Sequence, residues 1–219
     1  KQTAVALSRR QGRNVFVTLA ERGILGASPD GSVEHAPTLP VRGEIDIVGA
    51  GDSVSANLTA ALAAGAELPE AMHLAMAAAN MVANGIKINC AFNIGSVITI
   101  ARRNLVDIFL KSDFDYIWWV DSDMKFPIDA PMRLLARGKE IVGANYRRRR
   151  FPNPNFTGMS GSAGKFTEFQ TTDQSPPMEL IDVLPHGMVL CKREVYERIP
   201  QPHYLQEFIP SLNLEIGED

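Results

Sequence analysis

The chain has 219 residues, 45% of them hydrophobic, so it is long enough to bury one sizeable core or two small ones. Its 22 Lys and Arg residues against 25 Asp and Glu residues give a formal net charge of -3, which offers no general attraction for nucleic acid or for an anionic membrane surface. We therefore expect small molecules as partners, and nothing in the composition predicts an oligomeric state.

The two cysteines, Cys90 and Cys191, lie far apart, which is typical of a reducing compartment rather than of a disulfide framework. The first ten residues hold too short an apolar run for a signal peptide. No uncharged stretch reaches the roughly 20 apolar residues of a membrane span. The sequence thus predicts a cytoplasmic protein without a membrane span.

The first part of the chain is predicted to form a small β-meander followed by two helices. Turn residues separate short apolar runs, and Gly65 and Gly85 are typical helix stops. The expected elements are strands at 15–19, 24–28 and 32–35 and helices at 54–64 and 69–84.

The residue pattern changes near residues 86–89, where we expect a domain boundary that divides the chain into 1–87 and 88–219. Beyond it, helical and strand patterns alternate, and a long loop is expected at 152–178. The expected elements are helices at 97–110, 129–136 and 193–198 and strands at 116–120, 140–145 and 180–192, with Asp129 as the cap of the short helix. The predicted fold class is α/β, with two partial Rossmann-like pieces.

A glycine-rich loop precedes the first of the two alanine-rich helices. Gly49, Ala50 and Gly51 stand where the chain enters the helix, so unpaired backbone N–H groups at the positive end of the helix dipole could bind a phosphate. Asp52 at that position would be repelled by the phosphate unless it accepts a proton from an attacking hydroxyl. The alternative is that Asp52 only caps the helix.

The string from Asp46 to Asp52, with the alanine-rich helix behind it, resembles the second signature of the ribokinase-like (PfkB) carbohydrate kinases. The resemblance implies that Asp52 is the catalytic base and that the amides of Gly49, Ala50 and Gly51 hold the transferred phosphoryl group of ATP. It also implies that Asp46 lies near a monovalent-cation or magnesium site, although Ile47 departs from the threonine that is usual in the family.

Residues 17–26 are similar to the strand and turn ahead of the nucleotide pocket in the same family, with Gly23 allowing close approach. The resemblance ends near residue 85, and the segment then corresponds to the C-terminal fragment of an ATP-binding domain. The family's sugar-binding part is not recognisable in the rest of the chain.

Two carboxylates alternate at the end of the strand predicted for residues 116–120. Because alternate strand residues point to one side, Asp121 and Asp123 can present their carboxylates to one ion. Hard oxygen ligands favour Mg²⁺ or Mn²⁺, and an ion at a strand end could neutralise a departing diphosphate. The alternative is a pair of solvated acids in a surface turn.

The sequence from Asp115 to Pro127, with its flanking segments 101–106 and 141–146, looks like a GT-A-type glycosyltransferase. The resemblance implies a nucleotide-sugar donor held through the metal, with Arg102 and Asn104 facing that donor. Residues 182–190 resemble the family's later strand beside the acceptor pocket, with His186 and Gly187 at its bend.

Three functional hypotheses follow. The chain is a glycosyltransferase-like enzyme that carries an ATP-binding segment, or a sugar kinase in which the later half replaces missing parts. The third hypothesis is a chimeric or truncated chain that binds nucleotide without a complete activity.

Overall fold

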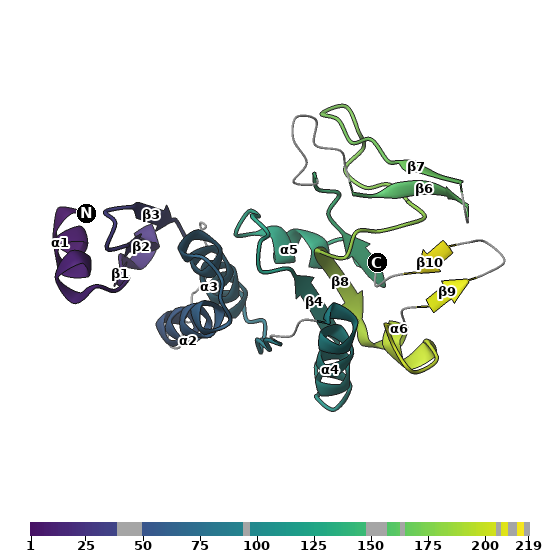
Figure 1. The fold of residues 1–219 in the computed structure, drawn as a ribbon, viewed down its shortest axis with the longest axis horizontal. Helices are drawn as coiled ribbons and strands as arrows, with labels where there is room; N and C mark the ends of the chain where they lie inside the picture. Colours follow the sequence, from purple (N-terminus) through teal and green to yellow (C-terminus); the bar gives the residue numbers. More distant parts are fainter. Residues whose placement is uncertain are drawn as a thin grey trace. The chain divides into compact units, whose positions relative to one another are not determined.

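The computed structural model describes residues 1–38, 50–93, 97–147, 157–162, 165–204, 207–209 and 214–216. The chain forms two compact units: Lys1–Phe92 with Ser122–Ala136, and Asn93–Asp121 with Arg137–Asp219. Both contain helices and small sheets (Figure 1), so the mixed α/β class is confirmed. Every strand pair among the described residues is antiparallel, so the Rossmann-like part of the expectation is not confirmed.

The first unit contains a three-stranded meander and its helices. Its elements are α1 (Gln2–Gln11), β1 (Val15–Thr18), the 3-10 turn η1 (Ala20–Arg22), β2 (Ile24–Ala27), β3 (Val33–Ala36), α2 (Ala50–Ala63), α3 (Leu68–Ala83) and α5 (Ala130–Leu135). The strand order is β1-β2-β3, as the sequence predicts. Helix α1 lies on one side of the meander and the α2–α3 pair on the other (Figure 1).

The meander is stable because its central strand is buried along its whole length. Leu25 and Ala27 pack with Ala4 of α1, which the sequence analysis did not predict as a helix. On α3, Met72 is fully buried, and small alanines line the same helix. Alanine favours the helix and allows α2 and α3 to pack closely, so these two helices are confirmed, with α2 beginning at Ala50.

The second unit contains a three-stranded sheet and two helices beside it. Its elements are α4 (Ile98–Leu110), β4 (Tyr116–Val120), β5 (Ile141–Gly143), β6 (Met159–Ser162), β7 (Lys165–Glu168), β8 (Met188–Lys192), α6 (Arg193–Arg198), β9 (Glu207–Ile209) and β10 (Leu214–Ile216). β8 lies in the middle, antiparallel to both β4 and β5. No helix among the described residues is long and apolar enough to cross a membrane.

Three local expectations were wrong. The predicted loop 152–178 contains the β6–β7 hairpin, and the predicted strand 180–192 is ordered as a strand only over β8. The side chain of Asp129 makes no cap bond at the start of α5 and instead accepts a hydrogen bond from Arg133 Nε at 2.7 Å. An ion pair one turn along the helix therefore replaces the expected cap.

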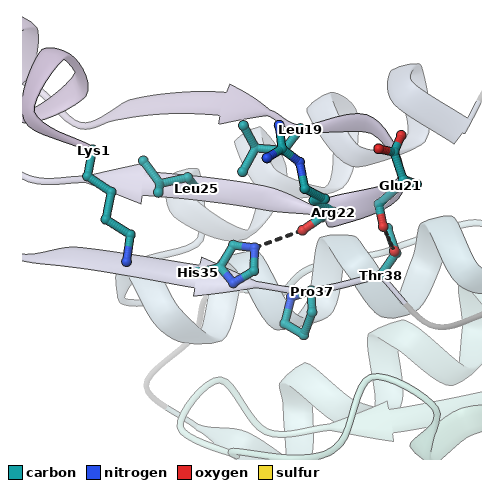
Figure 2. Close-up of a pocket in the computed structure, with 8 residues that line it drawn as sticks. All are labelled: Lys1, Leu19, Glu21, Arg22, Leu25, His35, Pro37 and Thr38. Atoms are coloured by element: carbon teal, nitrogen blue, oxygen red, sulfur yellow. Dashed lines mark hydrogen bonds between the residues drawn. The ribbon is translucent and has the colours of Figure 1, made fainter.

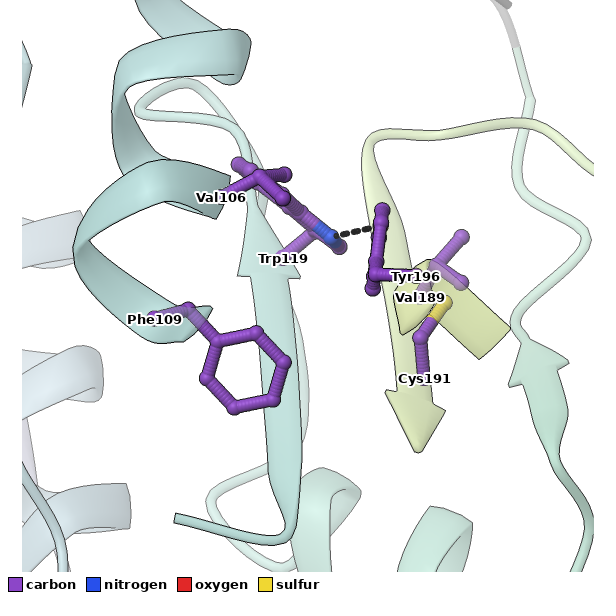
Figure 3. Close-up of a cluster of buried hydrophobic side chains, with 6 residues drawn as sticks. All are labelled: Val106, Phe109, Trp119, Val189, Cys191 and Tyr196. Carbon is purple, nitrogen blue, oxygen red and sulfur yellow. Dashed lines mark hydrogen bonds between the residues drawn. The ribbon is translucent and has the colours of Figure 1, made fainter. Parts of the chain in front are cut away.

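The core of the second unit joins α4, β4, β8 and α6 (Figure 3). Its buried side chains are Val106, Phe109, Trp119, Val189, Cys191 and Tyr196. The Trp119 indole N–H donates to the Tyr196 hydroxyl at 2.8 Å, which satisfies a donor that would otherwise be buried without a partner. Burial raises the pKa of the Cys191 thiol to about 11, so this thiol stays protonated at neutral pH.

Candidate functional site

The first candidate site lies at the start of α2. Asp52 stands in the first turn of this 14-residue helix, and both Asp52 and Gly51 are exposed. Ala50 is the first helical residue, whereas Gly49 and Asp46 lie outside the described residues. The structure thus describes the helix that carries Asp52 and leaves the predicted glycine loop and cation site untested.

The backbone of the first turn of α2 is open to a ligand. Among the described residues, no atom outside the helix's own backbone and the chain neighbours of Gly51 lies within 4 Å of the position that a Cβ atom on Gly51 would take. The first N–H groups of an α-helix have no partner within the helix and carry the positive end of its dipole. The first turn of α2 therefore has the backbone chemistry that favours a phosphate.

Gly23 is required by the backbone of the meander. Its φ is +91°, and a Cβ atom there would lie 2.0 Å from the Ala36 carbonyl oxygen. The close approach at Gly23 is thus between two chain segments of the meander, whereas the sequence resemblance implied close approach to a ligand.

A cavity of about 430 Å³ lies beside the turn between β1 and β2 (Figure 2). It is lined by Lys1, Leu19, Glu21, Arg22, Leu25, His35, Pro37 and Thr38. His35 Nε2 donates to the Arg22 carbonyl at 2.7 Å, and the Thr38 hydroxyl donates to the Glu21 carbonyl. The cavity combines leucine and proline surfaces with a few polar groups, as small-molecule sites commonly do.

The second candidate site lies at the end of β4. Asp121 directly follows the strand, and its N–H donates to the Gly187 carbonyl at 3.0 Å. Arg102 of α4 places Nη2 3.4 Å from Asp121 Oδ1. Arg102 is 5% exposed, whereas the Asp121 side chain is 41% exposed. The predicted residues Arg102 and Asp121 are therefore brought together, and their contact is an ion pair.

Asn104 lies away from Arg102 on α4, and the place of Asp123 stays a prediction. Asn104 is exposed and follows Arg102 by two residues, which is about 200° around the helix, so the two side chains leave α4 on nearly opposite sides. Asp123 is exposed and belongs to the segment that is grouped with the first unit. Its geometry with Asp121 is therefore not described.

The described residues contain no three-ligand metal cluster at Asp121. No three His, Cys, Asp or Glu side chains among them come close enough together to hold a metal. The Arg102 guanidinium lies 3.4 Å from Asp121. A carboxylate that is already paired with a cation is a poor ligand for a second one.

Sequence reasoning missed Tyr146 beside Asp121. The Tyr146 hydroxyl accepts a hydrogen bond from the Gly187 N–H at 2.8 Å. A Cβ atom on Gly187 would lie 2.3 Å from that hydroxyl oxygen and 3.1 Å from Asp121 Oδ2. Tyr146 and Asp121 thus both lie close to the backbone of Gly187. The predicted bend at Gly187 was the one sequence signal that could have pointed to this contact.

Gly187→Ala is expected to destabilise the second unit by about 1–3 kcal/mol, because the added methyl group has no room beside Tyr146. Urea unfolding followed by tryptophan fluorescence measures this, since both tryptophans of the chain, Trp118 and Trp119, lie in the second unit. Unchanged stability would show that Tyr146 does not pack on Gly187. Gly51→Ala, where a Cβ atom meets nothing within 4 Å, is the matched control and should leave this transition unchanged.

Tyr204, whose ring lies near Arg102, belongs to a chain of hydrogen bonds. The Tyr196 hydroxyl lies 2.8 Å from the Tyr204 hydroxyl, which lies 2.6 Å from His186 Nε2. Burial raises the pKa of Tyr204 to about 12, and burial followed by the neighbouring Cys191 raises the pKa of Tyr196 even more. Both phenols therefore stay neutral across the physiological range.

Comparison with known proteins separates the two halves of the chain. Residues 1–87 match the family model described as pfkB family carbohydrate kinase. This supports the sequence prediction for the first part of the chain. The GT-A resemblance of the later part stays a prediction.

The curated relatives are also similar over a limited stretch. The bifunctional protein HldE of Paramagnetospirillum magneticum is 41% identical over 91 residues, which are 42% of this chain and 18% of that protein. The bifunctional protein HldE of Shewanella sp. strain ANA-3 is 40% identical over 76 residues, 35% of this chain and 16% of that protein. This chain therefore matches less than a fifth of the length of each of these relatives.

Among solved structures, the crystal structure of A197 from STIV is similar, with a TM-score of 0.38 and 19% sequence identity. The similarity covers 57% of this chain and 61% of that one. At this TM-score and identity it supports no conclusion about fold or activity.

Proposed function

We propose that the first unit binds ATP and transfers its terminal phosphoryl group to a sugar hydroxyl, with Asp52 as the general base. The observation that carries the proposal is the position of Asp52 in the first turn of α2, within a segment that matches a carbohydrate kinase family. The exposure of Asp52 and the open space over Gly51 support it, because both are needed for a phosphate and an acceptor to reach this turn.

The chemistry divides between the backbone and one carboxylate. The N–H groups at the start of α2 stabilise the negative charge on the transferred phosphoryl group. Asp52 accepts the proton of the attacking sugar hydroxyl as the new P–O bond forms and the bond to the departing ADP breaks. Mg²⁺ enters with ATP as part of the substrate, where it neutralises phosphate charge.

The cavity beside the β1–β2 turn is the proposed place for the nucleoside part of ATP. Its volume of about 430 Å³ lies within the usual range for small-molecule sites. The apolar faces of Leu19, Leu25 and Pro37 can contact a base, and polar groups at its edge can bind a ribose.

The proposal is tested by calorimetric unfolding of the chain with and without ATP and Mg²⁺. A ligand that binds only the folded state stabilises it by about 2.7 kcal/mol at a concentration 100 times its dissociation constant, so the unfolding midpoint should rise. A panel of sugars is then assayed for phosphoryl transfer. No rise at millimolar ATP would overturn the nucleotide site. A rise without transfer would instead favour a truncated or chimeric chain that binds nucleotide without a complete activity.

A second candidate function for the chain is transfer from a nucleotide-sugar at the end of β4. The observation that favours it is the grouping of Asp121, Arg102 and Tyr146 at one strand end. Its test is the effect of a set of nucleotide-sugars on the fluorescence-detected unfolding midpoint, first without divalent ions and then with Mg²⁺ or Mn²⁺. No response under either condition would exclude this function.

A further inference from the structure

The end of β4 contains a buried cation whose surroundings are built around it. Arg102 is one of the few charged side chains among the described residues that are buried. An isolated buried guanidinium is strongly unfavourable, so it needs a charged partner. The described partner is Asp121, whose Oδ1 lies 3.4 Å from Arg102 Nη2.

Tyr204 also contacts Arg102 in this position. Its guanidinium carbon lies 6.0 Å from the ring centre of Tyr204, a distance at which a cation is attracted to an aromatic face. Tyr204 is fixed in turn by its hydroxyl contacts with Tyr196 and His186. The neighbouring Arg103 donates to the Tyr204 carbonyl at 3.3 Å, which ties the same turn to α4.

We infer that Arg102 is the resident cation of the Asp121 carboxylate, and that a divalent ion can bind Asp121 only in competition with it. Asp121 is then less available to a divalent ion than a carboxylate without a neighbouring cation. Asp121 instead balances the charge of Arg102 in the folded protein. This inference concerns the second unit and stands whether or not the first unit binds ATP.

The competition follows from Coulomb's law. A positive charge close to a carboxylate lowers its affinity for protons about tenfold to a thousandfold, and the affinity for a metal ion responds in the same direction. The guanidinium is also fixed by Tyr204, so a divalent ion cannot displace it without disturbing that contact. Removing the charge of Arg102 should therefore strengthen metal binding at Asp121.

The first experiment measures thermal unfolding of the full chain in EDTA, so that metal plays no part. Asp121→Asn should lower the unfolding midpoint, because it removes the negative charge that lies 3.4 Å from the buried Arg102 guanidinium. Asp107→Asn makes the same change at an exposed position of α4 and should leave the midpoint unchanged. If Asp121→Asn is as stable as the wild type or more stable, the inference is wrong.

The second experiment measures Mn²⁺ binding by the loss of the free-ion electron paramagnetic resonance signal. Arg102→Met, which keeps an unbranched side chain without the charged guanidinium, should bind Mn²⁺ about tenfold more tightly than the wild type. Adding Asp121→Asn to that variant should remove the gain. Arg198→Met removes a positive charge from an exposed pair in the same unit and should leave Mn²⁺ affinity unchanged.

Two further measurements keep the inference testable if Arg102→Met does not fold. Arg102→Lys retains the charge and should bind Mn²⁺ as weakly as the wild type. Asp121→Asn alone should change the Mn²⁺ affinity of the wild-type chain less than twofold. A tenfold loss on that single substitution, or weaker Mn²⁺ binding by Arg102→Met, would show that Asp121 is a metal ligand with Arg102 in place.

Discussion

Asp52→Asn is expected to slow phosphoryl transfer from ATP to the acceptor sugar by about 10²- to 10⁴-fold, while ATP with Mg²⁺ still raises the unfolding midpoint of the variant. Asparagine keeps the size of the side chain but cannot accept the proton of the attacking hydroxyl. Binding should persist, because the proposed phosphate contacts are backbone N–H groups at the start of α2. Initial rates of transfer and calorimetric midpoints, measured on the same preparations, separate the two effects.

Glu67→Gln is the matched control for Asp52→Asn. Glu67 is an exposed carboxylate at the start of α3. Glu67→Gln therefore removes the same charge next to another helix start in the same unit. We expect normal ATP binding and normal transfer for this variant. If Asp52→Asn transferred phosphate at the wild-type rate, Asp52 would be a helix-terminal charge with no part in catalysis.

The sequence predicted the elements of the first unit well because local signals there agree with each other. Gly65 and Gly85 stop the two helices near the expected residues, and short apolar runs bounded by turn residues give the strands of the meander. Helix α1 was missed. Its sequence from Gln2 to Gln11 is mostly polar, so it carries little apolar periodicity, and its few buried residues, such as Ala4 and Ser8, are small.

In the second unit, sequence patterns located β4 and α4 but not the pairing of the strands. Residues 180–192 contain a long apolar stretch that reads as one strand, yet Pro185 interrupts it and only β8 is paired. The β6–β7 hairpin was read as loop because glycine and serine dominate it. Pairing between distant strands depends on contacts that no local pattern records.

The candidate sites were predictable only where one short string holds the residues. Asp52 and Asp121 stand next to recognisable local features, a glycine-rich helix start and a strand end. Tyr146 and Tyr204 come from other parts of the chain, and no spacing links them to Asp121. The pairing of Arg102 with Asp121 changes the expected chemistry of the carboxylate, and it depends on how α4 packs against β4.

Arg193 is the residue whose loss should most weaken the second unit. Its guanidinium donates to the carbonyls of Phe109, Leu110, Ser112 and Phe114 at 3.0, 3.3, 2.8 and 2.9 Å. The last carbonyls of a helix have no partner within the helix, and a cation there also interacts favourably with the helix dipole. Arg193, at the start of α6, thus caps the C-terminus of α4.

Arg193→Met is expected to lower the unfolding free energy of the second unit by about 3 kcal/mol, because it leaves several carbonyls near the end of α4 unpaired and removes the cation that lies 4.8 Å from the Phe109 ring centre. Urea unfolding followed by the fluorescence of Trp118 and Trp119 reports on this unit, and the midpoint should fall while its steepness stays the same.

Arg198→Met makes the same substitution at the other end of α6. Arg198 is exposed and pairs with Glu140 at 2.6 Å, an arrangement that typically contributes about 0–1 kcal/mol. A large difference between the two variants would therefore measure the buried cap and not the loss of a positive charge. If Arg193→Met were no less stable than Arg198→Met, the end of α4 would be stabilised by the apolar contacts of Phe109 alone, and the guanidinium would contribute little to the fold.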